Sequence, residues 1–414
     1  MSVTAAIPAL ADLSLATSGR VPLEVLQRWA YGVRDAATAT ALLQPFAVDG
    51  IAVASDTAGL SRMTREMELW EVVRIVSLPK QIVHALGTAV GGRAIGRWVA
   101  DNTLMFYPPP VTVETVLDAM FEAQARIAAA NPARIGLCVH PGRFYELGEG
   151  LHGADARLCE VLAESHAGPG EILLTERARD AIRDRGPYVL RPREDLAGAV
   201  DAVVFSLVTG RRLPALVGTN VEYPHDFSPE AFRPLVAPGA AADQASAKER
   251  VYASSLCDRA VLFVVREHRP RAAEDLAAML DGLLLDAIVE SLARRLAPNE
   301  ARVLVPAAGI TILVCGTVRT AFALAVEVRE RAVRTGLPLR LGIDSGPILL
   351  FESGGAVLGV TGDAVNTASK LSEDVGEVHR IALTTRALRG LDPPPAGEPF
   401  AVTVSNVTLT GVKV

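Results

Sequence analysis

The sequence predicts an α/β protein that contains two copies of one domain. Short apolar stretches alternate with helical patterns, which indicates sheets covered by helices. Several stretches recur at an offset of about 210 residues, as expected for an internal repeat. The residues between the copies are rich in Pro, Ala and Gly, a composition typical of a linker. We therefore expect an N-terminal extension with one helix (1–45), a first domain (46–210), a linker (211–248) and a second domain (249–414).

The first copy has a recognisable order of elements. In the extension, residues 23–33 have helical spacing after Pro22. The domain then shows a short buried strand, a long helical stretch, a hairpin around a tight turn and an amphipathic helix. The residues are 51–54 for the strand, 69–86 for the helix with a break near Pro79, 94–99 and 103–107 for the hairpin, and 113–129 for the second helix.

The second copy repeats this order. Its strand is 260–265, its first helix 274–296, its hairpin 301–315 and its second helix 318–333. Three pairs of stretches define the repeat: Arg134-Ile135-Gly136-Leu137 with Arg340-Leu341-Gly342-Ile343, 172–178 with 381–387, and 196–200 with 409–413.

Composition excludes several classes of function. The net charge of −6, dispersed Lys and Arg, and few aromatic residues argue against nucleic-acid binding. No apolar run reaches about 18 residues, so we expect no membrane span. The first residues lack the charged start of a signal peptide. The four cysteines lie far apart, which favours reduced thiols in a cytoplasmic protein over a zinc site or a disulfide framework.

The stretch 339–371 carries the most specific pattern. A strand is expected to meet a turn at Ser345-Gly346-Pro347, and Gly354-Gly355 should turn a hairpin. Gly362-Asp363 then opens a helix, with Asp363 as a candidate cap. Asn366 and Lys370 are four residues apart and share one face of this helix. That face suits a phosphate-bearing ligand, although a solvated helix face has the same spacing.

Arg340-Leu341-Gly342-Ile343-Asp344-Ser345-Gly346-Pro347, followed by the helix from Gly362 to Leu371, resembles the signature of class III nucleotidyl cyclases, the adenylate and guanylate cyclases. The resemblance implies two ferredoxin-like domains of α+β type, each a mostly antiparallel sheet with helices on one face. It also implies that the copies pair as a pseudo-heterodimer within one chain. The family's arginine, four residues after the asparagine, is Lys370 here.

The resemblance implies a metal site in the first copy. Asp56-Thr57-Ala58-Gly59 resembles the family's loop after the first strand, and Asp101 stands at the hairpin position of the second metal aspartate. In the family, two Mg²⁺ or Mn²⁺ ions bound there activate the ribose 3′-hydroxyl and neutralise the triphosphate. Asp56 as a helix cap and Asp101 as a turn former are the structural alternatives.

Each copy keeps what the other lacks. The second copy has Arg266-Glu267 and Ala308-Gly309 in place of the carboxylates, and the first has Arg157 and Val161 in place of Asn366 and Lys370. The resemblance therefore implies one composite site, with Asp56, Thr57 and Asp101 as metal residues, Asn366 and Lys370 as catalytic residues, and Gly362 and Asp363 near the nucleotide.

Two functions remain open at this point. A cytoplasmic cyclase would make a 3′,5′-cyclic nucleotide from a nucleoside triphosphate with Mg²⁺ or Mn²⁺. A degenerate cyclase would bind a nucleotide, or a protein partner, as a regulatory module. The positions that read the purine in the family are Val305 and Gly359, whose side chains form no hydrogen bond, while Arg97 stands at the lysine position of the first copy.

Overall fold

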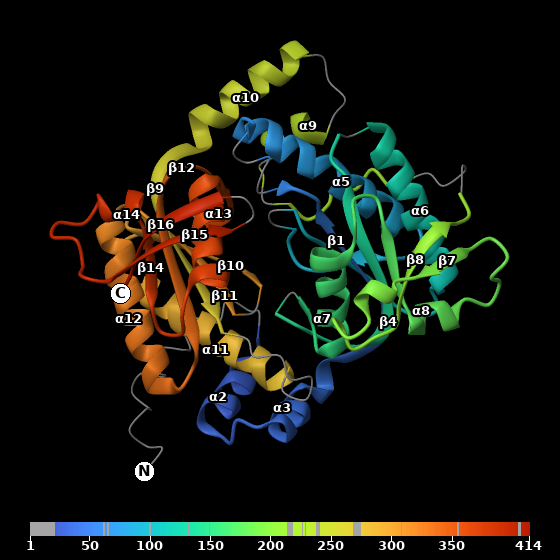
Figure 1. The fold of residues 1–414 in the computed structure, drawn as a ribbon, viewed down its shortest axis with the longest axis horizontal. Helices are drawn as coiled ribbons and strands as arrows, with labels where there is room; N and C mark the ends of the chain where they lie inside the picture. The colour runs from blue at the N-terminus through green and yellow to red at the C-terminus, as the bar shows by residue number, and fades with distance from the viewer. Residues whose placement is uncertain are drawn as a thin grey trace. The chain divides into compact units, whose positions relative to one another are not determined.

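The structure, a computed structural model, forms two compact units, which we describe separately. Residues 44–241 form the first unit, and residues 21–43 join 242–414 in the second (Figure 1). The structure describes residues 21–60, 63, 66–98, 101–130, 132–148, 150–212, 218–225, 227, 229–236, 241–267, 275–307, 309–353, 356–404 and 407–414.

The first unit is built on a mixed sheet in the order β2-β3-β1-β4-β6-β8-β7, with β5 paired to β4. All its strand pairs are antiparallel except β4 with β6. The strands are β1 (Ala47–Thr57), β2 (Arg93–Ala94), β3 (Thr103–Tyr107), β4 (Ile135–Leu147), β5 (Gly150–His152), β6 (Ile172–Thr175), β7 (Val189–Pro192) and β8 (Val204–Thr209).

Helices cover both faces of this sheet. Successive residues of a strand point to opposite faces, so Ile51 and Val53 of β1 enter one core cluster and Ala52 and Ala54 enter another. The first cluster includes α5 (Leu69–Ala89) and α6 (Val113–Ala130), and the second includes α7 (Ala154–Val161) with its continuation η3 (Leu162–His166). The expectation of helices on one face is therefore wrong, because the short α7 covers the other. The remaining helices are η2 (Gln44–Phe46), α8 (Glu176–Ala181), η4 (Glu194–Leu196) and α9 (Pro229–Val236).

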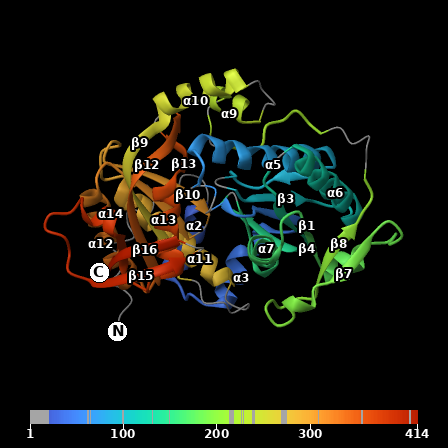
Figure 2. The same cartoon turned by 45° about the horizontal axis from the view of Figure 1, so that its top comes forward.

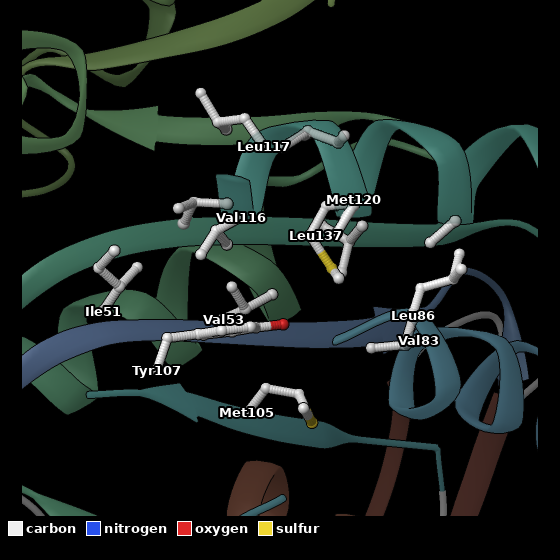
Figure 3. Packing of buried hydrophobic residues seen from close by; sticks show 14 of the residues in the cluster. Ile51, Val53, Val83, Leu86, Met105, Tyr107, Val116, Leu117, Met120 and Leu137 are labelled. Atoms are coloured by element: carbon white, nitrogen blue, oxygen red, sulfur yellow. The ribbon is translucent and has the colours of Figure 1, made fainter. Parts of the chain in front are cut away.

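Figure 3 shows the larger cluster from close by. Side chains of the strands point toward apolar residues of α5 and α6 in a layer that contains no charged group among those drawn. The labelled strand residues are Ile51, Val53, Met105, Tyr107 and Leu137, and the helix residues are Val83, Leu86, Val116, Leu117 and Met120. Burial of these side chains stabilises the unit by roughly 25 cal/mol per Å² of apolar surface removed from water.

The second unit repeats the sheet strand for strand. Its order is β10-β11-β9-β12-β14-β16-β15, with β13 paired to β12 and only β12–β14 parallel. The tandem repeat predicted from the sequence is confirmed at the level of topology. The strands are β9 (Leu256–Arg266), β10 (Ala301–Ala307), β11 (Ile310–Cys315), β12 (Leu339–Ser353), β13 (Ala356–Thr361), β14 (Ile381–Thr384), β15 (Glu398–Val404) and β16 (Val407–Lys413).

The helices of the second unit follow the same plan (Figure 2). In α12, Thr317 accepts a hydrogen bond from the backbone N–H of Thr320 at the start, and Gly336 ends the helix in a left-handed conformation. The helices are α10 (Ala241–Ser255), α11 (Asp275–Ala293), α12 (Val318–Thr335), α13 (Asp363–Lys370) with its continuation η6 (Leu371–Val375), and α14 (Thr385–Leu388).

The N-terminal extension packs on the second unit. Its helices α2 (Leu23–Tyr31) and α3 (Ala36–Leu43) contact α11. Trp29 is fully buried, and its Nε1 donates to Asp281 Oδ1 at 3.0 Å. Arg34 Nη2 donates to the carbonyl of Thr335 at 2.5 Å. The chain therefore starts and ends in one unit, with the first repeat inserted between.

Three local expectations differ from the structure. Pro79 does not break its helix, because α5 runs from Leu69 to Ala89 and Pro79 is buried within it. Packing thus offsets the lost backbone hydrogen bond, a cost of about 3 kcal/mol. In place of the strand expected at 94–99, the structure has the short strand β2, which ends at residue 94. Residue 99 of the expected strand and the turn expected at 354–355 lie outside the described residues.

The range expected as a linker contains ordered structure. It includes α9 and the start of α10, whose alanine-rich sequence has high helix propensity. Tyr223 and Phe232 are buried in the core of the first unit, and the Tyr223 hydroxyl lies 3.2 Å from Ser77 Oγ. The proline and glycine content therefore indicated where the repeats are connected, but it did not predict that this connection packs on the first unit.

Among the described residues, no helix is both long enough and apolar enough to cross a membrane.

Candidate functional site

Asp56 and Asp101 come together at the end of two paired strands. The β1–β3 ladder ends with Ser55 opposite Thr103, and their hydroxyl oxygens lie 2.6 Å apart. The residues just beyond this pair bring the carboxyl groups of Asp56 and Asp101 into a shared hydrogen bond. Strand register alone therefore explains why two residues so far apart in sequence meet.

Burial controls the charge of this pair. Burial, together with the negative charges of Asp101 and Glu164, raises the pKa of Asp56 to about 8. Burial also raises the pKa of Asp101, while the charge of Lys80 opposes that increase. A cation beside the pair would oppose these increases and favour the ionised carboxylates.

The donor set around the pair fits a hard divalent cation. Two carboxylates satisfy what Mg²⁺ and Mn²⁺ take from a protein when water and phosphates complete the coordination. Thr57 Oγ1 is buried and has no hydrogen-bond partner in the part of the chain that the structure describes. No group of three or more His, Cys, Asp or Glu able to hold a metal occurs among those residues.

Two further charged residues border the pair, and sequence reasoning missed both. Glu164 of η3 accepts a hydrogen bond from Asn102 Nδ2 at 2.9 Å. Lys80 of α5 is 3% exposed and donates to the carbonyl of Trp98 at 3.1 Å. Lys80 has a signal in the sequence, because it falls on the apolar face of its helix between the buried Val76 and Val83.

The helix start in the second unit is organised by Gly362. Its φ of +148° favours glycine, and a Cβ there would lie 2.9 Å from the carbonyl oxygen of Pro347. The Gly362 carbonyl accepts from the N–H groups of Val365 and Asn366, both at 3.1 Å. Gly362, not Asp363, is the cap of α13, which corrects the sequence prediction.

Asp363 instead takes part in an ion-pair network. Its carboxylate lies 3.0 Å from Arg386, which also pairs with the fully buried Asp344. Thr384 donates its hydroxyl proton to Asp344 at 2.5 Å. This network ties the first turn of α13 to β12 and β14, and it fixes the orientation of the helix.

Asn366 and Lys370 lie on α13 as the spacing predicted. The Nδ2 atom of Asn366 is buried and has no hydrogen-bond partner within the described residues. Lys370 lies near Glu373, where its charge opposes the increase in the carboxyl pKa that burial causes. An unused amide donor and a cation therefore project from one helix face.

The first unit has the same helix start without these groups. Gly153 has φ of +101°, and its carbonyl accepts from the N–H of Arg157 at 3.1 Å, as Gly362 does from Asn366. Arg157 thus occupies the position of Asn366. Asp155, which stands one residue further from the glycine than Asp363 does, pairs with Arg177 at 2.8 Å.

At the corresponding strand ends of the second unit, the described residues include Gly309 and Arg266. Gly309, at the hairpin before β11, donates its N–H to Asp286 Oδ2 at 2.8 Å, and Thr311 donates its hydroxyl to Asp286 Oδ1 at 2.6 Å. Arg266, at the end of β9, lies 3.6 Å from Asp281. Both oxygens of Asp286 thus accept a hydrogen bond from the hairpin.

The two positions that the resemblance assigns to recognition of the purine lie on strands of the second unit. Val305 lies in β10, and Gly359 lies buried in β13 opposite Phe351. Arg97 is exposed and lies outside β2. Neither Val305 nor Gly359 brings a polar side-chain group to these strands.

No family model matches the sequence, and no curated protein matches it. Solved structures do. The adenylyl cyclase CyaB from P. aeruginosa is 16% identical, over 40% of this chain and 96% of that one, with a TM-score of 0.35. A class III adenylyl cyclase-like ATP-binding protein from Pseudomonas aeruginosa is 16% identical, over 83% and 85%, with a TM-score of 0.49. The guanylate cyclase domain of RhGC from Catenaria anguillulae, in complex with GTP, is 14% identical, over 40% and 99%, with a TM-score of 0.33. The similarity is one of fold alone.

Proposed function

We propose that the chain is a divalent-metal-dependent nucleotidyl cyclase, which converts a nucleoside triphosphate into a 3′,5′-cyclic nucleotide and pyrophosphate. The observation that carries this proposal is the placement of the half-buried Asp56 and the buried Asp101 at the ends of two paired strands, where burial raises the pKa of both carboxyl groups. A cap and a turn residue would face water and need no such arrangement.

In this proposal the first unit supplies the metal residues. Asp56, Asp101 and Thr57 would hold Mg²⁺ or Mn²⁺, which when bound lowers the pKa of the ribose 3′-hydroxyl and neutralises the triphosphate. The chain's own part is to release the proton of Asp56 as the ion enters. The rigid β1–β3 ladder keeps both carboxylates in position.

The second unit would supply the polar groups that position the nucleotide. The unused Nδ2 of Asn366 would donate to the ribose or phosphate, and Lys370 would pair with a phosphate oxygen. Gly362 lets the chain turn sharply into α13, and the Arg386 ion pair keeps the charge of Asp363 away from the phosphates. The two sets of residues belong to different units, so the proposal requires the units to pair, within one chain or between two.

The second candidate is a degenerate cyclase that binds a nucleotide, or a regulatory protein, without turnover. Lys370 favours it, because lysine lacks the planar fork with which arginine grips phosphate oxygens. Val305 and Gly359 favour it too, since neither side chain forms a hydrogen bond to a base.

The experiment is incubation of the full chain with each nucleoside triphosphate and Mg²⁺ or Mn²⁺, followed by chromatography of the products. A cyclic nucleotide that disappears in Asp56→Ala supports the cyclase. If no product forms, but a triphosphate with Mn²⁺ raises the Tm of wild type and not of Asp56→Ala, the cyclase proposal is wrong and the nucleotide-binding module stands.

A further inference from the structure

The chain segment that carries Asp101 is held by a side-chain hydrogen bond from another element. Asn102, the next residue, donates its side-chain N–H to Glu164 Oε1 at 2.9 Å. Glu164 belongs to η3, the continuation of α7, which packs against β1 and β4. The hydrogen bond therefore joins the neighbour of Asp101 to an element that also packs on the strand of Asp56.

This contact acts where the backbone ladder ends. The β1–β3 ladder fixes Thr103 opposite Ser55, whereas Asp101 and Asn102 precede the first residue of β3. A carboxylate that binds a metal must be held closely in position, and hydrogen bonds around it commonly supply that support. A bond to the adjacent residue is such a support.

The helix of the second unit uses the equivalent glutamate differently. Glu373 is the third residue of η6, as Glu164 is of η3. Glu373 accepts a hydrogen bond from Ser369 Oγ at 2.9 Å, four residues earlier in the chain. In the first unit the residue four before Glu164 is Glu160, and like charges at this spacing repel. The side chain of Glu164 instead reaches the hairpin segment.

The hairpin changes together with the helix. In the second unit Ile310 follows Gly309, as Asn102 follows Asp101 in the first. The side chain of Ile310 is apolar and cannot donate a hydrogen bond. The donor, the acceptor and Asp101 thus occur in the same unit, which is the pattern expected if the bond serves that carboxylate.

We propose that Glu164 is a positioning residue for Asp101. It holds Asn102 and, through the peptide bond between Asn102 and Asp101, keeps the Asp101 carboxyl group beside Asp56 for the metal. This inference rests on the proposed function. Glu164 acts as a hydrogen-bond acceptor, so its oxygen atom matters rather than its charge.

The test measures Mn²⁺ binding to the full chain with a non-cyclisable triphosphate analogue, from the electron paramagnetic resonance signal of the free ion. Glu164→Ala and Asn102→Ala should each weaken Mn²⁺ binding about fivefold, because each removes one side of the same hydrogen bond. The double variant should bind no more weakly than either single variant. Both side chains are exposed, so these variants should fold, and their melting temperatures check this.

Glu164→Gln separates position from charge. Its side-chain carbonyl oxygen accepts a hydrogen bond as the carboxylate does, but the negative charge is gone. This variant should bind Mn²⁺ within about twofold of wild type, because the hydrogen bond is kept. If Glu164→Gln binds as weakly as Glu164→Ala, or if Asn102→Ala binds as wild type does, the inference is overturned.

Glu146→Ala is the matched control. Glu146 is a partly exposed carboxylate of the first unit that accepts side-chain hydrogen bonds, from Arg93 at 2.7 Å and 2.6 Å. It lies near the end of β4 opposite to Gly136, the ladder partner of Asp56. Its loss should leave Mn²⁺ binding unchanged.

The inference and the proposed function fail in different ways. If Asp56→Ala binds Mn²⁺ as tightly as wild type, the proposed function is wrong and the inference falls with it. If binding depends on Asp56 but is unchanged in Glu164→Ala and Asn102→Ala, only the positioning role of Glu164 is wrong.

Discussion

The two units carry different charged groups at corresponding hairpins of a common fold. In the first, Asp101 precedes β3 and Asp56 lies near the end of β1, and burial raises the pKa of both carboxyl groups. In the second, the hairpin brings Gly309 and the helix brings Asp286, whose oxygens are satisfied by Gly309 N–H and Thr311 Oγ1. The first arrangement brings two carboxyl groups together, whereas the second pairs one carboxylate with hydrogen-bond donors of its hairpin.

The starts of α7 and α13 also differ, and here the candidate functional groups are in the second unit. Both α7 and α13 begin at a glycine with positive φ, and both tie an aspartate to an arginine, Asp155 to Arg177 and Asp363 to Arg386. Within the described residues, α13 carries Lys370 and the buried Nδ2 of Asn366, which has no hydrogen-bond partner there, whereas α7 has Arg157 and Val161 at these positions. The shared framework is structural, so the groups added to it in one unit alone are the better candidates for function.

The largest expected effect tests this division of labour. Asp56→Ala and Asn366→Ala should each reduce cyclase activity at least about a thousandfold, because positioned charge on both sides of the phosphates is the main source of rate. The measurement is initial rate at saturating Mn²⁺ and nucleotide. Arg157→Ala, at the matching position of α7, is the control and should retain activity.

Mixing Asp56→Ala with Asn366→Ala then distinguishes how the units pair. If the site forms within one chain, mixing restores nothing. If it forms between chains of a symmetric dimer, mixing should restore up to about a quarter of wild-type activity, since half the dimers are mixed and each has one intact site.

A smaller effect is expected on the stability of the closed arrangement. Asp286→Ala should lower the free energy of unfolding by about 1–3 kcal/mol, because it leaves the Gly309 N–H and the Thr311 hydroxyl buried without acceptors. Denaturant titration of the full chain measures this, with Asp286→Asn expected to lose less. If Asp286→Ala were as stable as wild type, the second hairpin would not depend on this carboxylate.

Lys370→Arg should raise turnover by up to about tenfold if Lys370 touches the phosphates in the transition state, because arginine adds a bidentate grip. The measurement is kcat and KM with the preferred nucleotide. A change in KM alone would assign Lys370 to ground-state binding.

The smallest effect concerns the framework of the first unit and its pH dependence. Burial tends to raise the pKa of Asp155, but hydrogen bonds from His140 and from the N–H of Arg143 outweigh it and lower that pKa. A carboxyl group with a lowered pKa stabilises the fold above its unfolded pKa of about 3.9, and the contribution is lost as pH falls through the folded value.

Asp155→Asn should therefore lower the free energy of unfolding by about 1 kcal/mol at pH 7, and the difference from wild type should shrink below about pH 4. Melting temperatures from pH 2.5 to 7 measure it, with the exposed Asp201→Asn as control. A difference that does not vary with pH would mean that the charge of Asp155 contributes nothing.

The sequence by itself determined the repeat, the order of strands and helices, and the position of Asp56 at the end of a buried strand. Each of these depends on patterns local to the chain, such as alternation in strands and helical spacing. The allocation of candidate groups to the two copies followed from comparing equivalent stretches, which also needs no contact between distant residues.

The residue-by-residue correspondence between the two repeats could not be predicted from such patterns. In the structure Leu137 pairs with Ile172 and Leu341 pairs with Ile381, so Leu137 corresponds to Leu341. The arginine–glycine motifs had suggested instead that Leu137 corresponds to Ile343. A shift of two residues leaves every side chain on the same face of a strand, so the hydrophobic pattern cannot detect it.

Only the tertiary structure decided which charged groups meet. Lys80 and Asp286 lie on helices far in sequence from the hairpins they contact, and the packing of helix on sheet brings them there. Packing also explains why Pro79 is tolerated inside α5, where it is buried. It likewise places Trp29 where its indole N–H donates to Asp281 of the second unit. A buried charge is stabilised by partners that packing supplies, and neighbours along the chain do not reveal them.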